Sequence, residues 1–337
     1  MTRGRWLQAS LLLAVGLLIL YGLLRTVHPA EVGAAIRRAS LGWVLLGFLS
    51  SLGFVALRGW RWHLILGASG SRASLGDTVA VTGVGFGVNS VSPFKLGEFL
   101  RIGMIAQRAE IGIGEAGATV VLERILDVLA LLVLAIATAL LSGDRSNGGG
   151  VWGGLAVLSA ISLLVGIGAY VMMLKRAATM AVVERASRWL PERLHAPILK
   201  LADSVLRGFT FLRSPDRFAR VGVLSLLTWI VPTLGFVAYF RAVSPDLSFL
   251  TLYLGLTLFV ITQAISITPA SVGTFEGLFV LVLSAFHAGP PSALAAIAVI
   301  AHVGGIVGLL VTAGLGAAWL RLNRPGLPIR AEGALSR

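Results

Sequence analysis

Three ionisable residues lie inside a long apolar run of this sequence. Glu123, Arg124 and Asp127 interrupt the run from Ile113 to Leu141. On a helix, Asp127 can reach Arg124 at i+3 and shares a face with Glu123 at i+4. An ionisable side chain costs about 2.5–3.5 kcal/mol at the centre of a membrane helix unless it is paired or wetted. The spacing therefore predicts a buried charged site. The alternative is a helix end near the cytoplasmic interface, with snorkelling side chains.

Two further groups of polar residues lie where apolar runs break. Residues 89–98 and 268–276 each contain a hydroxyl residue, a proline next to it, a glycine four residues after the proline, and then a glutamate. Proline ends a helix because it has no N–H and restricts the residue before it. The exposed N–H groups and positive dipole end of a broken helix suit a phosphate or a carboxylate. Because lipid cannot satisfy such groups, they must line protein or a wet cavity.

The predicted substrate-binding residues come from both breaks and from the charged run. Lys95 and Arg101 add positive charge to the first break, and Glu98 either balances it or simply pairs with Arg101 at i+3 near an interface. The full set is Asn89, Pro93, Lys95, Gly97, Glu98, Arg101, Glu123, Arg124, Asp127, Thr268, Pro269, Ser271, Gly273 and Glu276. No residue is assigned a catalytic role.

The histidines and the remaining arginines beside apolar runs indicate structural roles. The chain has no cysteine, and its five histidines show no metal-ligand spacing, so we expect no metal site and no cofactor. His302, in the last apolar run, is expected to be a hydrogen-bonded packing histidine rather than a proton carrier. Arg58 and Arg61 lie beside tryptophans, a pattern typical of an anchor at the membrane interface.

The composition indicates an integral membrane protein. Of 337 residues, 56% are hydrophobic and 13% are charged, with a mean hydropathy of +0.89, whereas soluble domains have roughly 25% charged residues. The formal net charge is +13, carried mostly by arginines dispersed between apolar runs. This distribution favours cytoplasmic loops facing anionic lipid over a nucleic-acid surface. We expect no sizeable soluble catalytic domain.

Apolar runs of spanning length alternate with basic segments. The predicted spans are Trp6–Leu24, retained rather than cleaved as a signal peptide, Leu41–Leu57, Ile113–Leu141, Val151–Leu174, Val221–Phe240 and Ala293–Leu320. Residues 175–220 are rich in arginine and are predicted to be cytoplasmic, as interfacial amphipathic helices or as a small helical hairpin. If both termini are cytoplasmic, counting the membrane crossings leaves two segments, near 74–108 and 250–287, that each begin and end on the same side of the membrane. Each is predicted to be a re-entrant hairpin.

The sequence thus predicts an all-α polytopic membrane protein with an inverted repeat of two halves, each with three spanning helices and a re-entrant helical hairpin. Two spanning helices in place of the second hairpin satisfy the parity equally well. The expected parts are a first half at 1–145 with its hairpin near 74–108, a second half at 146–325 with the amphipathic segment 175–220 and a hairpin near 250–287, and a cytoplasmic tail at 326–337.

The runs Asn89–Arg101, Glu123–Asp127 and Thr268–Gly277 together resemble the lysylphosphatidylglycerol synthase transmembrane region family. That family includes the flippase domain of bacterial lysylphosphatidylglycerol synthases and stand-alone proteins of unassigned substrate. The sequence differs from the family's usual Pro-Gly-Arg at positions 94–95, and from its usual Thr-Pro-Gly-Gly at positions 270–271. The resemblance therefore implies the family's fold and a lipid substrate, but not which lipid.

Inverted symmetry and the resemblance together imply a lipid translocase of the bacterial inner membrane, not an enzyme, that moves a lipid with an anionic or zwitterionic headgroup between leaflets. The expected ligand is a membrane phospholipid or a polyprenyl (isoprenoid) lipid. The alternatives are an accessory subunit that presents lipid to a separate synthase, and an intramembrane enzyme with Glu98, Asp127 or Glu276 as base. The candidate protein partners are a second copy of the chain and a separate lipid-modifying synthase. No nucleic acid is expected.

Overall fold

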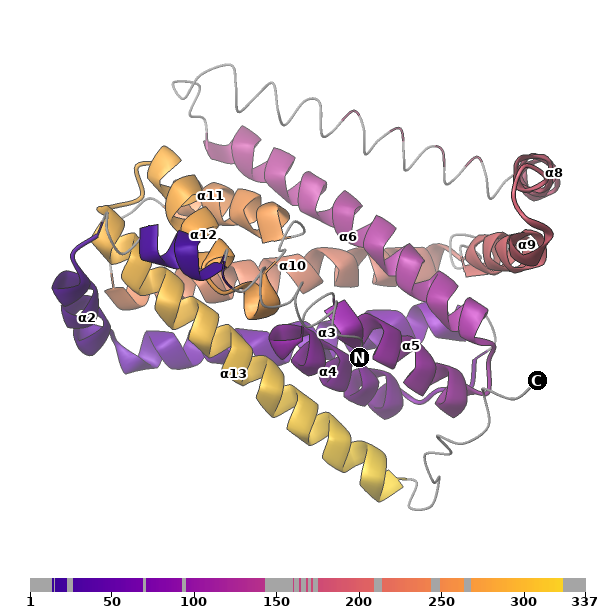
Figure 1. Ribbon diagram of the computed structural model, residues 1–337, viewed down its shortest axis with the longest axis horizontal. Helices are drawn as coiled ribbons and strands as arrows, with labels where there is room; N and C mark the ends of the chain where they lie inside the picture. The colour runs from indigo at the N-terminus through magenta and orange to yellow at the C-terminus, as the bar shows by residue number, and fades with distance from the viewer. Residues whose placement is uncertain are drawn as a thin grey trace.

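The computed structural model describes residues 14, 16–22, 27–68, 71–92, 95–142, 160, 164, 168, 171, 175–208, 214–243, 249–263 and 268–323. These residues form helices and short turns, with no strand among them, as the sequence predicted. The helices are α2 (Pro29–Arg38), α3 (Leu41–Ala68), α4 (Leu75–Val91), α5 (Leu96–Ala109), α6 (Ile113–Ser142), α8 (Arg176–Ser187), α9 (Glu192–Gly208), α10 (Pro215–Val243), α11 (Phe249–Thr262), the short η4 (Pro269–Ser271), α12 (Thr274–Ala285) and α13 (Pro291–Asn323) (Figure 1).

Within the described residues, three helices are long and apolar enough to cross a membrane, namely those at Leu41–Gly67, Pro215–Val243 and Pro291–Asn323. They contain three of the predicted spans. α6 is equally long, at 30 residues, and carries the charged run in its interior. The predicted spans at 6–24 and 151–174 lie largely outside the described residues, as do the loop 143–150, Pro93 and the tail 326–337.

Two helix pairs occupy the positions predicted for hairpins. α4 and α5 have 17 and 14 residues, and α11 and α12 have 14 and 12. At a rise of about 1.5 Å per residue, each is shorter than the roughly 30 Å hydrocarbon core. Lys95 takes a left-handed conformation before α5 (φ 51°), and Ala270 and Ser271 do so before α12 (φ 50° and 56°). Each pair is therefore broken where the sequence predicted, while re-entry and inverted symmetry stay predictions.

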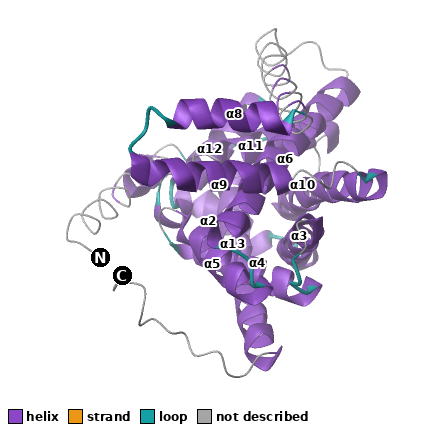
Figure 2. Cartoon of the chain, turned by 90° about the vertical axis from the view of Figure 1, so that its right-hand side faces the viewer, coloured by secondary structure: helices purple, strands orange, loops and turns teal. Residues whose placement is uncertain are grey.

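Short helices lie at the two ends of the molecule, and two of them, α2 and α9, are amphipathic. Figure 1 shows α2 at one end and α8 with α9 at the other, and Figure 2 shows α8 and α9 side by side. α9 packs against α6. The sequence did not predict α2, a ten-residue helix that begins at Pro29, where proline's missing N–H costs no helix hydrogen bond. The helical segments predicted within 175–220 are present as α8 and α9.

Polar contacts join the start of α4 to the end of α5 and to α13. Asp77 near the start of α4 forms an ion pair with Arg108 near the end of α5. The Arg108 Nη2 also donates to the backbone carbonyl of Leu320 on α13, at 2.7 Å. Ser74 caps α4 by accepting a hydrogen bond from the Asp77 backbone N–H at 3.0 Å. These bonds fix one end of α4 and α5 against α13, so that their break lies at the opposite end.

Small residues let α13 pack closely against α4. A Cβ at Gly83 would lie 2.7 Å from the carbonyl oxygen of Thr312, and a Cβ at Gly316 would lie 2.5 Å from that of Ala80. Such contacts are typical of helices that associate in membranes. Gly83 on α4 meets Thr312 on α13, and Ala80 on α4 meets Gly316 on α13. Residue numbers therefore rise along α4 as they fall along α13, so the two helices are antiparallel. The end of α4 therefore points along α13 toward its first half, and η4 contacts α4 directly. The second break therefore lies beside α4, the helix that leads into the first break.

We expect Gly316→Ala to lower the melting temperature of the detergent-solubilised protein, because the added methyl group meets the Ala80 backbone at 2.5 Å. Gly305→Ala, on the same helix, is the matched control, since nothing lies within 4 Å of a Cβ there. Both changes give the same gain in helix propensity. Equal melting temperatures for the two variants would contradict the close packing of α4 and α13.

We also expect cysteines at Lys95 and Ser271 to crosslink in at least one conformation, because η4 contacts α4, the helix that leads into the first break. The chain has no native cysteine, so the products are unambiguous. A cysteine pair at Lys95 and Ser284, near the far end of α12, serves as the control. If both cysteine pairs failed to crosslink, or if both crosslinked at the same rate, a substrate site formed by the two breaks together would be excluded.

Candidate functional site

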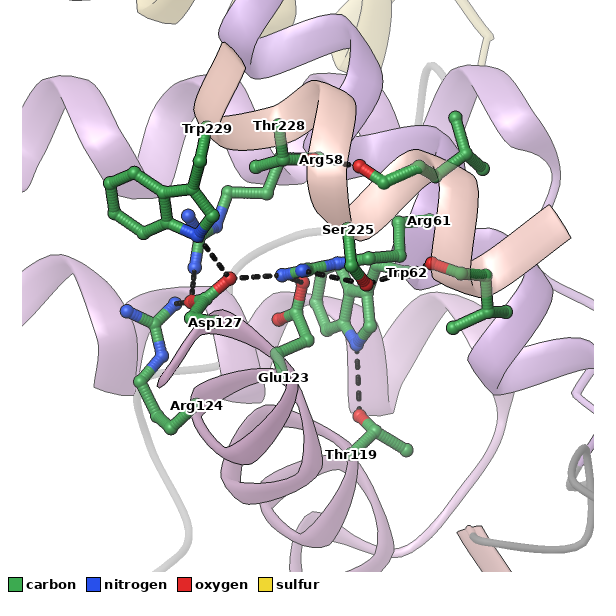
Figure 3. Close-up of polar contacts among 12 residues, drawn as sticks. Arg58, Arg61, Trp62, Thr119, Glu123, Arg124, Asp127, Ser225, Thr228 and Trp229 are labelled. Atoms are coloured by element: carbon green, nitrogen blue, oxygen red, sulfur yellow. Dashed lines mark hydrogen bonds and ion pairs between the residues drawn. The ribbon is translucent and has the colours of Figure 1, made fainter. Parts of the chain in front are cut away.

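Arginines and carboxylates from α3, α5 and α6 form one ion-pair network in the interior. Figure 3 shows the part contributed by α3 and α6, with Ser225 and Trp229 beside it. In the described part of the chain the network's members are Arg58, Arg61, Arg101, Arg124, Glu98, Glu123 and Asp127. The side chains of Arg58, Arg61, Arg101 and Glu123 are at most 1% exposed. The predicted alternative, a snorkelling helix end, is therefore wrong for Glu123 and Asp127, which are buried among cations.

Asp127 is the centre of this network. It pairs with Arg58, and its Oδ1 accepts a hydrogen bond from Arg61 Nη2 at 2.7 Å. The same oxygen accepts a hydrogen bond from the indole Nε1 of Trp229, on α10, at 3.2 Å. Arg61 Nη1 also donates to the Ser225 hydroxyl at 3.3 Å. One carboxylate thus joins α3, α6 and α10.

Glu123 performs the corresponding role for α5. It pairs with Arg101, and its Oε1 lies 3.6 Å from Arg61 Nη2. The Arg101 guanidinium lies 4.3 Å from the ring centre of Trp62, whose Nε1 donates to the Thr119 hydroxyl at 2.9 Å. The Arg101 pair therefore attaches the α4–α5 hairpin to the charged face of α6.

Aromatic rings lie against the Arg58 guanidinium, as the Trp62 ring does against Arg101. Arg58 lies 4.9 Å from the ring centre of Phe86, 5.3 Å from that of Phe54 and 5.8 Å from that of Trp229. A buried ion loses several kcal/mol of hydration, which pairing restores only if the geometry is good. Cation–π contacts add roughly 2 kcal/mol each when desolvated. Together these contacts make a stable dry charge cluster chemically reasonable.

Arg124 differs from the other three arginines. Its side chain is 44% exposed, and its Nη2 lies 3.4 Å from Asp127 Oδ2 and 3.7 Å from Glu98 Oε1. Both contacts are longer than a normal hydrogen bond. Among the described members, four guanidiniums face three carboxylates, which leaves an excess of one positive charge. The network therefore presents a loosely held guanidinium at its edge, and guanidinium binds phosphate or carboxylate well.

The interpretation of Arg58 and Arg61 as an interfacial anchor is wrong. The predicted span ended at Leu57 because the next residues are charged, but α3 continues to Ala68. Arg58 and Arg61 lie on one helix face at i, i+3, opposite the acidic i, i+4 pair of α6. That complementary spacing was the signal available in the sequence. Of the two neighbouring tryptophans, Trp60 is 49% exposed and Trp62 is buried.

The other predicted residues of the first break lie around Gly97. A Cβ on Gly97 would lie 1.9 Å from the Gly85 carbonyl oxygen and 2.7 Å from Asn89 Oδ1, so only glycine lets α5 approach α4 here. Asn89 Oδ1 has no hydrogen-bond partner among the described residues. Glu98 lies 3.8 Å from Arg101 Nε, which is the predicted i,i+3 pair. Lys95 is exposed at the break itself.

The predicted residues of the second break form a separate group. Glu276 Oε2 accepts a hydrogen bond from the backbone N–H of Gly273 at 2.9 Å, and the hydroxyls of Thr268 and Thr274 lie 2.8 Å apart. His302, on α13, lies 2.7 Å from Glu276 Oε1, as expected for a hydrogen-bonded histidine. Pro269 and Ser271 form the turn η4 beside this group. None of the described ion pairs joins the two groups.

Comparison with known proteins gives distant relatives of similar length and one longer one. The chain is 22% identical to a UPF0104 membrane protein of Methanothermobacter thermautotrophicus, over 86% of this chain and 89% of the relative. A UPF0104 membrane protein of Methanocaldococcus jannaschii is also 22% identical, over 86% and 88%. The glycosyltransferase AglD of Haloferax volcanii is 26% identical over 89% of this chain, which spans about half (52%) of that relative.

The family described as Lysylphosphatidylglycerol synthase TM region matches residues 7–313, a stretch that includes the whole ion-pair network and both breaks. The resemblance inferred from the three short runs is therefore confirmed over most of the sequence. This chain belongs to the lysylphosphatidylglycerol synthase transmembrane region family.

Proposed function

We propose that this protein moves a lipid with an anionic or zwitterionic headgroup between the leaflets of a membrane. The observation that carries the proposal is Arg124, a half-exposed guanidinium at the edge of a buried network with one excess positive charge. Its longer contacts with Glu98 and Asp127 leave donors that a phosphate could use. Family membership supports a lipid as the ligand.

In this proposal the headgroup phosphate binds Arg124 while the acyl or isoprenoid tails stay in the bilayer. The buried arginines behind Arg124 add positive potential in a region of low dielectric, where charges act over a longer range. Glu98 and Asp127 keep the guanidinium oriented when no lipid is bound. The ligand is a phospholipid or a polyprenyl lipid, since either has a phosphate next to its tails.

The α4–α5 hairpin is the part proposed to move with the lipid. Glu98 and Arg101 lie on α5, whereas Arg124 lies on α6, so headgroup binding at Arg124 competes with the contact between these helices. The 3.7 Å contact from Arg124 to Glu98 is weaker than the hydrogen-bonded pairs inside the network. We place the protein in the bacterial inner membrane with α8, α9 and both termini in the cytoplasm, because the arginine-rich segment favours that side.

A second candidate function is suggested by AglD, which is named a glycosyltransferase. This chain matches about half of AglD, so an accessory unit that presents a lipid-linked substrate to a separate enzyme, or to a second copy of this chain, is the alternative. An intramembrane enzyme has less support, because Glu98, Asp127 and Glu276 each contact a basic side chain in the structure.

We expect Arg124→Gln to reduce lipid transport at least about tenfold, equivalent to about 1.4 kcal/mol of lost headgroup binding. The assay uses proteoliposomes with fluorescent phosphatidylglycerol or phosphatidylethanolamine and follows headgroup accessibility in each leaflet. Arg188→Gln is the matched control, since Arg188 forms an exposed pair with Glu184 on α8.

Both variants should be compared at equal expression and melting temperature. Equal transport by Arg124→Gln and Arg188→Gln would contradict the role of Arg124. A chemically altered lipid, detected by mass spectrometry, would instead support an enzyme, and binding without transport would support the accessory role.

A further inference from the structure

Glu276 and His302 form a buried acid–imidazole pair beside the second break. Their side chains are 8% and 10% exposed, and Nδ1 of His302 lies 2.7 Å from Oε1 of Glu276. Glu276 is in the first turn of α12, and His302 is on α13. In the described part of the chain neither residue forms another ion pair. The pair is therefore distinct from the arginine network.

The hydrogen-bond partners fix how many protons the pair holds. Nε2 of His302 lies 2.9 Å from the backbone carbonyl oxygen of Ala270, which can only accept, so Nε2 carries a hydrogen. Oε2 of Glu276 already accepts the Gly273 N–H. The 2.7 Å contact between Nδ1 and Oε1 then needs a proton, donated either by an imidazolium or by a neutral carboxyl group. In both cases the pair holds one proton more than a carboxylate with a neutral imidazole.

Loss of that proton must break one of the two contacts of the imidazole. If the remaining hydrogen stays on Nε2, two lone pairs face each other across the Nδ1–Oε1 contact. If it moves to Nδ1, the bare Nε2 faces the Ala270 carbonyl oxygen. The second case releases a strained turn, since Ala270 and Ser271 both have positive φ values (50° and 56°). A non-glycine residue held in this region costs about 1–3 kcal/mol.

The turn is packed so that its release would reach the first break. A Cβ on Gly273 would lie 1.9 Å from the Gly16 carbonyl oxygen, so the helical segment 16–22 lies directly against the turn. η4 also contacts α4, which leads into the first break. The Phe275 ring stacks on the His302 ring at 4.4 Å and covers it on one side.

We propose that Glu276 and His302 form a proton-binding site that holds the turn 268–273 closed when loaded and frees it when the proton leaves. His302 then carries a proton, instead of serving only the packing role predicted from the sequence. The proton-binding site is inferred from the hydrogen-bond geometry alone and does not depend on the proposed function. Its further consequence, that lipid movement is coupled to proton release and uptake, rests on the proposed function.

The elements packed against α12 and α13 carry titratable groups of their own. These groups are Tyr21 on 16–22, His28 at the N-cap of α2, Glu31, Arg37 and Arg38 on α2, Arg58, Arg61 and His63 on α3, Asp77 on α4, Asp216, Arg217, Arg220, Tyr239 and Arg241 on α10, Tyr253 on α11 and Arg321 on α13. Arg58, Arg61 and Asp77 form the ion pairs described above. The Tyr239 hydroxyl lies against Gly304, two residues from His302.

The test uses two variants that mimic the two states. In Glu276→Gln the amide can donate to Nδ1 while its oxygen still accepts the Gly273 N–H, which copies the loaded pair at every pH. In His302→Ala the turn loses its imidazole donor at every pH. The readout is the alkylation rate of a cysteine at Ser271, divided by that of a cysteine at Ser284 to remove the effect of thiol ionisation.

With the otherwise unaltered chain in nanodiscs, we expect this ratio to rise at least about fivefold as the pH increases. It should stay low in Glu276→Gln and high in His302→Ala. Nitrogen-15 NMR of His302 should show hydrogen on Nε2 at low pH. The proposal would be overturned by a ratio that does not change with pH, or by a His302 ring that holds its single hydrogen on Nδ1 throughout.

A transport assay then tests the coupling of lipid movement to protons separately from the proton-binding site itself. Lipid movement should respond to a pH gradient in the unaltered chain and not in Glu276→Gln. If the Ser271 ratio changes with pH but transport ignores the gradient, the proton site holds and the coupling is wrong. If the proposed function itself is wrong, Arg124→Gln will leave lipid transport unchanged.

Discussion

Burial of Asp127 between arginines is the interaction on which the rest of the structure depends. An isolated charge is very unstable in a low-dielectric interior, so each buried guanidinium needs a carboxylate at contact distance. Asp127 satisfies two of them from α3 and binds the Trp229 indole of α10 as well. Because α3, α6 and α10 must all approach this one carboxylate, their relative positions are constrained far more tightly than apolar packing alone would require.

The same constraint separates a fixed part of the site from a changeable part. Inside the network, Arg58, Arg61 and Arg101 are paired with carboxylates, and aromatic rings lie against Arg58 and Arg101. Arg124 has no such enclosure, and Glu276 with His302 lies beside a turn of strained residues. A tightly paired charged centre with a half-exposed cation at its edge, and a buried acid–imidazole pair next to the second break, together suit the proposed binding and release of a charged headgroup.

The sequence predicted the parts of this arrangement that depend on spacing along one helix. The acidic face of α6, the two broken helix pairs and the Glu98–Arg101 contact all follow from i+3, i+4 or proline rules, and all are present. The partners of Arg58 and Arg61 could not be predicted, because they lie on another helix and depend on which helices are neighbours. The predicted span also ended too early, at Leu57, because Arg58 is charged, whereas α3 continues to Ala68. His302 meets Glu276 across two helices, so its partner was invisible in the sequence for the same reason.

The most direct test of the central claim is a double-mutant cycle on Arg58 and Asp127. Arg58→Met, Asp127→Leu and the double variant are compared by the free energy of unfolding in bicelles. Each single change should cost about 3–5 kcal/mol, because it leaves a buried charge without its partner. The double variant should lose clearly less than the sum of the two, because it removes both charges together. Strictly additive losses would contradict the claim that pairing at Asp127 holds these helices together.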